Sequence, residues 1–131
     1  FLLDRDFLRV MLPSGRDLYY YNPIIHDGSV YFAGTNTFTK KWERIQMYGG
    51  KWAENVTQAV SRDILAHNMM LVESKHFQIV GSIHDELITE QTPAKTRSPM
   101  MLSKLISTQP KWALGLPLGA KGYQAQRFKK E

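Results

Sequence analysis

One uninterrupted helical pattern limits what this chain can fold into more than any other feature of its sequence. Residues 51–72 contain no Gly and no Pro, and their apolar side chains recur at steps close to 3.6 residues. The apolar positions are Ala53, Val56, Val60, Ile64 and Leu71. Side chains at this spacing share one face of an α-helix, so the pattern predicts a long helix that packs this face against other elements.

Polar side chains occupy the opposite face of the same predicted helix. The stripe consists of Lys51, Asn55, Gln58 and Arg62. Their spacing of i, i+4, i+7 and i+11 stacks them along one line of the helix. Such a stripe suits a nucleic-acid groove, where amides contact base edges and cations contact phosphates. A solvated helix face has the same pattern, so the spacing leaves both interpretations open.

Two hairpins are predicted before the helix. Residues 7–12 and 17–22 are β-type runs on either side of Pro13-Ser14-Gly15-Arg16, a sequence typical of a reversing turn. The tyrosines at positions 19–21 could stack on nucleic-acid bases or pack against neighbouring strands.

The second predicted hairpin pairs residues 30–33 with residues 37–45 around Gly34. A loop over residues 23–29 precedes it, and Gly49-Gly50 is expected to break the chain before the helix begins.

The sequence after the helix predicts a third strand pair and a second, shorter helix. Residues 77–83 and 87–89 read as strands around a tight connection. Ser98-Pro99 is typical of an N-cap followed by Pro at the first helical position, so a helix is expected from there to about Ser107. The tail from Thr108 is rich in Pro and Gly, and residues 123–128 read as an edge strand.

These elements, without repeats or low-complexity linkers, predict one α+β unit. A length of 131 residues fits one domain, and 43% hydrophobic with 22% charged residues is typical of a globular protein. The absence of Cys excludes a disulfide framework, a thiolate zinc site and a cysteine nucleophile. The net charge of +5 fits a polyanionic partner without requiring one.

The sequence also limits where the chain is expected to act. No apolar run approaches the roughly 20 residues of a membrane helix, and no secretion signal opens the chain. Because it begins at Phe1 rather than Met, we expect it to be a piece of a longer polypeptide.

A pair of adjacent carboxylates is the strongest candidate for chemistry. Asp85 and Glu86 follow His84 between two apolar strands, where Asn-Gly or Asp-Gly would suit a tight turn better. Two neighbouring negative charges reduce stability unless something neutralises them, and a divalent cation such as Mg²⁺ or Mn²⁺ would do so. The alternative is that both carboxylates face water at a loop tip.

Four ordered segments of the chain are similar to segments of a known family. VGSIHDELITE (80–90) resembles motif C of family A DNA polymerases, the palm hairpin that holds a catalytic Asp. Three further segments are similar to the bacteriophage-type branch: LRVMLPSGRDLYYYNP (8–23), KWERIQMYGGKWAENVTQAVSRDIL (41–65) and GLPLGAKGYQAQRFKK (115–130). Together they cover almost the whole chain in the same order, which implies an antiparallel palm-type sheet packed on the long helix.

The resemblance implies a role for each matching residue. Asp85 matches the aspartate that ligates two Mg²⁺ ions, with Mn²⁺ as a substitute, and Glu86 matches the adjacent supporting carboxylate. His84 would lie near the primer terminus. Gln58 matches a helix glutamine that contacts duplex DNA. Three further residues of the stripe are expected to bind DNA beside it, namely Asn55, Arg62 and Lys51.

Parts of the family pattern lie outside this chain. The second metal-binding Asp (motif A), the fingers helix (motif B), the thumb and any exonuclease domain do not match residues 1–131, which are expected to be the C-terminal part of a palm domain. One carboxylate pair cannot hold two metal ions 3.5–4 Å apart without its partner strand. The isolated fragment is therefore expected to be inactive.

The intact protein is expected to be a DNA-directed DNA polymerase in the cytoplasm of a bacterial host, of phage or prophage origin. Its partners would be primer-template DNA, deoxynucleoside triphosphates and the remainder of the polymerase chain. Two alternatives remain: a non-catalytic DNA-binding or accessory module derived from a polymerase, and a small metal-dependent nuclease.

Overall fold

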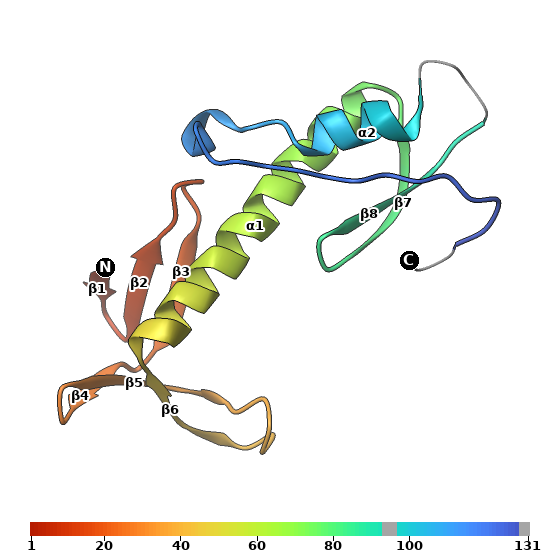
Figure 1. The fold of residues 1–131 in the computed structure, drawn as a ribbon. Coiled ribbons are helices and arrows are strands. Elements are labelled where there is room, and N and C mark those ends of the chain that lie inside the picture. Colours follow the sequence, from red (N-terminus) through yellow and green to blue (C-terminus); the bar gives the residue numbers. More distant parts are fainter. Residues whose placement is uncertain (93–96, 129–131) are drawn as a thin grey trace. The chain divides into compact units, whose positions relative to one another are not determined.

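The computed structural model describes residues 1–92 and 97–128 of the chain (Figure 1). They form antiparallel strands and α-helices, which confirms the predicted α+β class. The chain divides into two compact units, Phe1–Val60 and Ser61–Glu131, here called the N-terminal and the C-terminal unit. The one sheet expected from the sequence is replaced, in the described part of the chain, by three small sheets.

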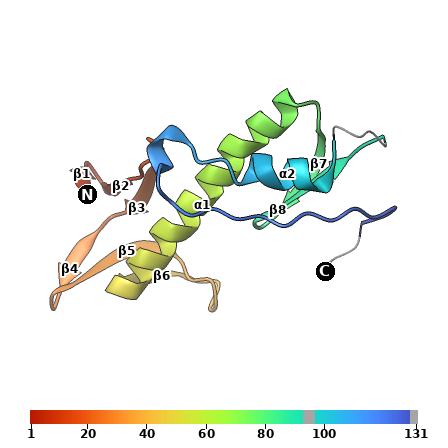
Figure 2. The ribbon, with the colours of Figure 1, turned by 45° about the horizontal axis from the view of Figure 1, so that its top comes forward.

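Two of these sheets belong to the N-terminal unit (Figure 2). Their strand orders are β1-β2-β3 and β4-β5-β6, and every pair of neighbours is antiparallel. The strands are β1 (Leu2–Asp4), β2 (Phe7–Met11), β3 (Asp17–Tyr21), β4 (Ile24–His26), β5 (Ser29–Thr35) and β6 (Trp42–Met47).

The first predicted hairpin is confirmed by the pairing of β2 with β3. Its connection is closed by a hydrogen bond from the Leu12 N–H to the Arg16 carbonyl at 2.8 Å. A second bond joins the Gly15 N–H to the Leu12 carbonyl at 3.0 Å. Gly15 has a φ of 88°, a conformation that glycine adopts without steric cost, so the Pro-Ser-Gly-Arg sequence serves the turn as predicted.

The predicted loop over residues 23–29 is wrong, because it contains β4 and a tight turn into β5. Asp27 and Gly28 both have positive φ, 47° and 72°, and His26 pairs with Ser29 across them. A two-residue Asp-Gly turn of this kind matches the right-handed twist of the strands it joins. The Asp-Gly pair was therefore a hairpin signal in the sequence.

The turn between β5 and β6 also lies elsewhere than predicted. Gly34 is inside β5, opposite Glu43, rather than at the reversal. The reversal is built by Asn36, whose Oδ1 accepts the N–H groups of Phe38 at 2.8 Å and Thr39 at 3.2 Å. An asparagine side chain that bonds the backbone two residues on favours a turn, and this outweighs the glycine.

Tyr20 is the centre of the core of the N-terminal unit. Its ring lies 4.9 Å from that of Trp52 and 5.1 Å from that of Phe32, both edge to face. Val10 and Met47 are buried in the same cluster. The Tyr20 hydroxyl accepts a hydrogen bond from Asn55 Nδ2 at 3.0 Å, which satisfies a polar atom that burial would otherwise penalise.

The long helix α1 (Gly49–Ser74) confirms the prediction to within two residues at each end. Gly49 and Gly50 are part of it rather than a break, and Ala53, predicted to pack, is exposed. In the N-terminal unit the helix contributes Trp52 and Val56 to the core. In the C-terminal unit its buried residues are Ile64, Leu65, Asn68 and Val72. The single apolar stripe predicted for α1 therefore does not fully describe the packed face of the helix in either unit.

The C-terminal end of α1 fixes the start of strand β7 (Gln78–Ile83). The carbonyl of Val72 accepts the N–H of Phe77 at 3.3 Å, and that of Glu73 accepts the N–H of His76 at 2.8 Å. His76 has a φ of 61°, so these bonds form the Schellman motif with a left-handed residue after the helix. Its usual apolar contact is present, because Val72 and Phe77 are buried in one cluster with Leu105.

Strand β7 pairs with β8 (Glu86–Glu90), which confirms the third predicted strand pair. The second predicted helix is confirmed as α2 (Pro99–Ile106), followed by a 3-10 turn at Lys111–Ala113. The Ser98 Oγ accepts the N–H of Met101 at 3.2 Å, so Ser98 is the N-cap and Pro99 the first helical residue.

Asn68 links the two helices of the C-terminal unit. Its side chain is fully buried, and its Nδ2 donates to the carbonyls of Ile106 at 2.6 Å and Thr108 at 3.0 Å. These carbonyls lie at the end of α2, where helical partners are missing. The amide therefore holds the end of α2 against α1.

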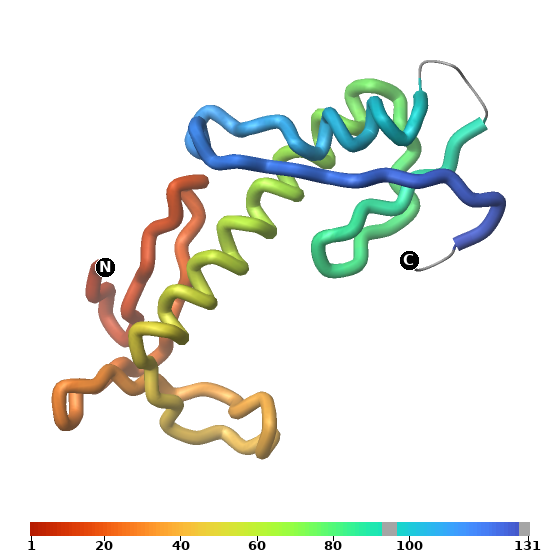
Figure 3. The backbone as a smooth tube through the Cα atoms, viewed as in Figure 1, coloured from red at the N-terminus to blue at the C-terminus, as the bar shows by residue number. Residues whose placement is uncertain are grey.

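The tail after the 3-10 turn is extended and forms no strand in its described part, up to residue 128 (Figure 3). The edge strand predicted at residues 123–128 is therefore wrong. All six of these residues are exposed, so there is no buried apolar face to stabilise strand pairing. Gly122 lies so close to α2 that a Cβ there would meet the Pro99 carbonyl at 2.9 Å.

Among the described residues, neither helix is long and apolar enough to cross a membrane.

Replacing Asn68 with Ala is expected to lower the free energy of unfolding of the C-terminal unit by about 2 kcal/mol. The change removes both N–H donors from the carbonyls at the end of α2. Urea denaturation followed by circular dichroism measures the change in the free energy of unfolding. The matched control is His67→Ala, an exposed neighbour on α1, which should change stability by no more than about 0.5 kcal/mol. Equal effects of the two substitutions would contradict the role of the Asn68 bonds.

Replacing His76 with Gly is expected to raise the free energy of unfolding by about 0.5–1 kcal/mol. The left-handed conformation costs a residue with a Cβ more than it costs glycine, and this gain exceeds the extra entropy of the unfolded chain. The same substitution at His67, inside α1, should instead lower stability by about 0.5 kcal/mol. Loss of stability at both positions would show that His76 does not end the helix in this way.

Candidate functional site

The predicted site residues Asp85 and Glu86 lie at the tip of the β7–β8 hairpin. Ile83 pairs with Glu86, so the turn itself is the dipeptide His84-Asp85, and Glu86 is the first residue of β8. This corrects the expected placement of both carboxylates in the turn. The sequence His84-Asp85-Glu86 is still a continuous polar tip on two apolar strands.

His84 supplies the backbone geometry that the turn requires. Its φ is 54°, which lies in the left-handed region. No glycine is present in this turn to adopt that conformation. Histidine is enriched in this region compared with most non-glycine residues. Other turns of the chain use the same conformation at Arg5, Asn22, Asp27, Lys40 and His76. The conformation of His84 is therefore explained by the hairpin.

The base of the hairpin is fixed by the core of the C-terminal unit. Ile79 and Leu87 pack against the buried cluster that contains Val72 and Phe77. The strand register shifts between Ile79 and Gly81, as in a β-bulge, which bends a strand and changes the direction of the residues beyond it. The tip is thus carried by two strands whose position is fixed by their packing against the core of the C-terminal unit.

All three residues of the tip are exposed. Within the described part of the chain, the Asp85 and Glu86 side chains form no ion pair or hydrogen bond. Carboxylate oxygens are the ligands that Mg²⁺ and Mn²⁺ prefer, so the pair fits one side of a metal site. Residues 1–92 and 97–128 contain no group of three or more His, Cys, Asp or Glu side chains placed to hold a metal ion. The remaining ligands would have to come from elsewhere.

The structure shows that the four residues of the polar stripe on α1 are not equally exposed. Gln58 and Arg62 are exposed, whereas Lys51 and Asn55 are half-buried. Asn55 uses one amide N–H in its bond to the Tyr20 hydroxyl, so it has a structural role beside any contact with DNA. Lys51, Asn55 and Gln58 belong to the N-terminal unit, and Arg62 belongs to the C-terminal unit with the hairpin tip.

Two structural residues near these positions were not singled out from the sequence. Trp52 lies between stripe residues and anchors the first turn of α1 in the core. Asn68 is the one polar side chain among the buried positions of α1. A polar residue at i+4 from Ile64 and i−4 from Val72, both buried, was a signal that the sequence contained.

The fold and the site define an α+β segment that presents adjacent hard oxygen ligands at the tip of an antiparallel hairpin. Its sequence is 34% identical, over 137 residues, to a DNA polymerase of Bacillus phage SP02. The match includes 100% of this chain and 21% of the phage protein. No family model and no solved structure matches the chain. The chain is thus related to part of a phage DNA polymerase and spans about a fifth of the length of that relative.

Adding Mn²⁺ to the nitrogen-15-labelled chain is expected to broaden the amide signals of residues 83–87 before those of other segments. The reason is that adjacent unpaired carboxylates attract a divalent cation more strongly than isolated ones. Two-dimensional NMR spectra measure the effect. The double variant Asp85→Asn, Glu86→Gln should remove it, whereas Glu90→Gln, at the other end of β8, should not. Broadening that is uniform over all exposed acidic residues would contradict a preferred site.

Proposed function

We propose that this chain is the C-terminal part of the palm of a bacteriophage-type family A DNA polymerase. The intact enzyme transfers a deoxynucleotide to the 3′-hydroxyl of a primer and releases pyrophosphate, as directed by a template. The observation that supports this most is the similarity of the whole chain to part of a phage DNA polymerase. The exposed Asp85-Glu86 pair on a supported hairpin agrees with the role that motif C has in that family.

In this proposal Asp85 is the principal metal ligand of the chain and Glu86 supports it. Asp85 and Glu86 would hold Mg²⁺ or Mn²⁺, which when bound would supply positive charge that favours ionisation of the primer hydroxyl and stabilises the transferring phosphoryl group. The hairpin contributes a fixed position for the carboxylates, because its base is packed on Val72 and Phe77. An aspartate outside this chain completes the ligand set.

The DNA-binding residues of the proposal have a different task, which is to test base pairing. The acceptors in the minor groove, purine N3 and pyrimidine O2, are present in every Watson–Crick pair. An amide donor such as Gln58 can therefore check the geometry of a pair without reading its sequence. His84 would act near the primer terminus, and Lys51, Asn55 and Arg62 would contact the DNA along α1.

The partners follow from the reaction. They are primer-template DNA, deoxynucleoside triphosphates and the remainder of the polymerase chain, and the place of action is the cytoplasm of a bacterial host. The basic excess of the sequence, +5, agrees with a nucleic-acid partner.

In a full-length polymerase that contains this segment, Asp85→Asn is expected to reduce primer extension by about 10³-fold or more. Loss of several kcal/mol of charge stabilisation has this effect on a rate. Binding of primer-template DNA, measured by fluorescence anisotropy, should change little. The control Glu90→Gln removes an exposed carboxylate from the same hairpin and should leave extension unchanged.

Two outcomes would overturn the proposal. Full extension by the Asp85→Asn enzyme would remove Asp85 from catalysis. If Gln58→Ala and Arg62→Ala weaken DNA binding while no form of the protein extends a primer, the non-catalytic accessory module is the correct interpretation. The 131-residue chain alone is expected to give no extension with Mg²⁺, because it holds only part of the ligand set.

A further inference from the structure

The outer face of the sheet β1-β2-β3 carries aromatic side chains that the core does not use. Tyr20 points into the core, so its neighbours Tyr19 and Tyr21 lie on the opposite face of β3. Phe7 pairs with Tyr21 across the sheet and shares this face. Tyr19 and Tyr21 are 58% and 42% exposed, and Trp42 at the start of β6 is 66% exposed.

These four rings form one connected surface, which we call the aromatic face: Phe7, Tyr19, Tyr21 and Trp42. The Phe7 ring centroid lies 5.3 Å from that of Tyr21 and 6.0 Å from that of Tyr19. The Tyr21 centroid lies 6.3 Å from that of Trp42. All four residues belong to the N-terminal unit, so the surface does not depend on the hairpin tip of the other unit.

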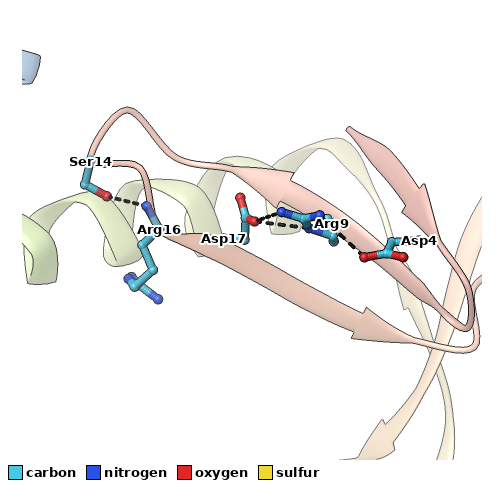
Figure 4. A network of polar contacts seen from close by, with 5 residues as sticks. All are labelled: Asp4, Arg9, Ser14, Arg16 and Asp17. Atoms are coloured by element: carbon cyan, nitrogen blue, oxygen red, sulfur yellow. Dashed lines mark hydrogen bonds and ion pairs between the residues drawn. The ribbon is translucent and has the colours of Figure 1, made fainter.

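The cation inside the aromatic face is already neutralised. Arg9 Nε donates to Asp17 Oδ2 at 3.1 Å, its Nη2 donates to the same oxygen, and its Nη1 lies 3.4 Å from Asp4 Oδ2 (Figure 4). The hydrogen bond with Asp17 and the charge of that residue raise the pKa of the Arg9 guanidinium above its ordinary value. The guanidinium carbon lies 5.6 Å from the centre of the Tyr19 ring. Arg9 therefore holds the sheet face together instead of offering its charge to a ligand.

A second arginine at the edge of the aromatic face does offer its charge. Arg44 Nη1 donates to the carbonyl of Asn22, the residue after Tyr21, and the side chain is exposed. Among the described residues no carboxylate lies within ion-pair distance of it. A guanidinium has five N–H donors, so donors remain for another acceptor. Lys40 and Lys41 are exposed and directly precede Trp42, which adds positive charge at the same edge.

We propose that the aromatic face binds single-stranded DNA, with bases stacked on Tyr19, Tyr21 and Trp42 and a phosphate bound by Arg44. Exposed aromatic rings beside free cations are what an unpaired strand requires, because every base has a face that can stack. The bases of a duplex are covered by their neighbours and cannot stack in this way. Lysine is depleted at protein–protein interfaces, so Lys40 and Lys41 favour a polyanion over a protein partner.

The spacing of the rings agrees with successive bases. Tyr19 and Tyr21 are two residues apart on one face of a strand, which separates their Cα atoms by about 6.8 Å. This distance leaves room for one base on each ring when the strand is unstacked. Antiparallel sheets elsewhere use exposed aromatic residues to stack two or three unpaired bases.

The test measures binding of the 131-residue chain to fluorescein-labelled oligothymidylate by fluorescence anisotropy, with EDTA and without nucleotide. Tyr21→Leu and Trp42→Leu keep an apolar side chain but remove the ring, and each should raise Kd by about tenfold. Tyr21→Phe and Trp42→Phe keep a stacking surface and should bind nearly as the unmodified chain does. Tyr123→Leu, at an exposed tyrosine of the C-terminal unit, is the matched control and should leave Kd unchanged. Circular dichroism checks that each variant is folded.

The salt dependence of binding tests the phosphate contact separately. Arg44→Gln should reduce the slope of log K against log salt concentration by about 0.7, the value for one phosphate contact on a single strand. Arg44→Lys keeps the charge and should keep the slope.

The proposal is overturned if the leucine variants bind oligothymidylate as tightly as the unmodified chain, or if duplex DNA competes as well as the single strand. It is also overturned if the aromatic face instead mediates self-association, seen as a concentration-dependent mass in sedimentation that Tyr21→Leu abolishes, without oligothymidylate binding. The assay contains EDTA and no nucleotide, and the aromatic face belongs to the N-terminal unit, so its outcome does not depend on metal binding at the hairpin tip. Failure of the polymerase proposal and failure of this one are therefore distinguishable.

Discussion

The carbonyl of Val72 at the end of α1 is the point on which the C-terminal unit depends. It accepts the N–H of Phe77 and so reverses the chain out of the helix directly into β7. The Val72 side chain is fully buried with Phe77 and Leu105, so the same residue closes the helix and forms the core. One helical turn earlier, Asn68 bonds the end of α2. Backbone closure, core packing and helix attachment thus occur within two turns of α1, and the hairpin that carries Asp85 starts from them.

Two groups of side chains do not take part in these contacts. Asp85 and Glu86 place adjacent negative charges at a hairpin tip with no cation among the described residues to offset them. The aromatic face leaves large apolar rings exposed to solvent, among them Tyr19 and Trp42. Adjacent like charges reduce stability and exposed apolar rings reduce solubility, so the binding role proposed above for each group accounts for features that the fold alone does not require. The contrast with Arg9 is informative, since that cation is satisfied by two carboxylates and has no such surplus.

Local sequence signals were sufficient to predict the elements that depend on residues close to one another in the sequence. The turn at Pro13-Ser14-Gly15-Arg16, the cap at Ser98-Pro99 and the extent of α1 were predicted correctly because each rests on neighbours in sequence. The turn at Asp27-Gly28 was also readable and was missed. What the sequence could not supply is the tertiary packing: α1 packs the partly buried Val56 against the core of one unit and buries Asn68 in the other, so no single periodic stripe describes it. The hairpin tip was located to within one residue, but the left-handed conformation of His84 depends on strand register, which only the folded pairing fixes.

The aromatic face and the carboxylate tip differ in how many of the groups needed for binding each of them presents. The aromatic face brings together rings from β2, β3 and β6 of one unit and the Arg44 guanidinium, which has no ion-pair partner among the described residues, so it presents both groups that the proposed contact with an unpaired strand needs. The carboxylate tip has the opposite character, because its strands pack on the core but no group of three or more His, Cys, Asp or Glu side chains among the described residues could hold a divalent cation. A partial ligand set on a well-supported hairpin is what one strand pair contributes when a second segment supplies the rest. This is the physical reason to prefer a part of a larger catalytic centre over a self-sufficient nuclease.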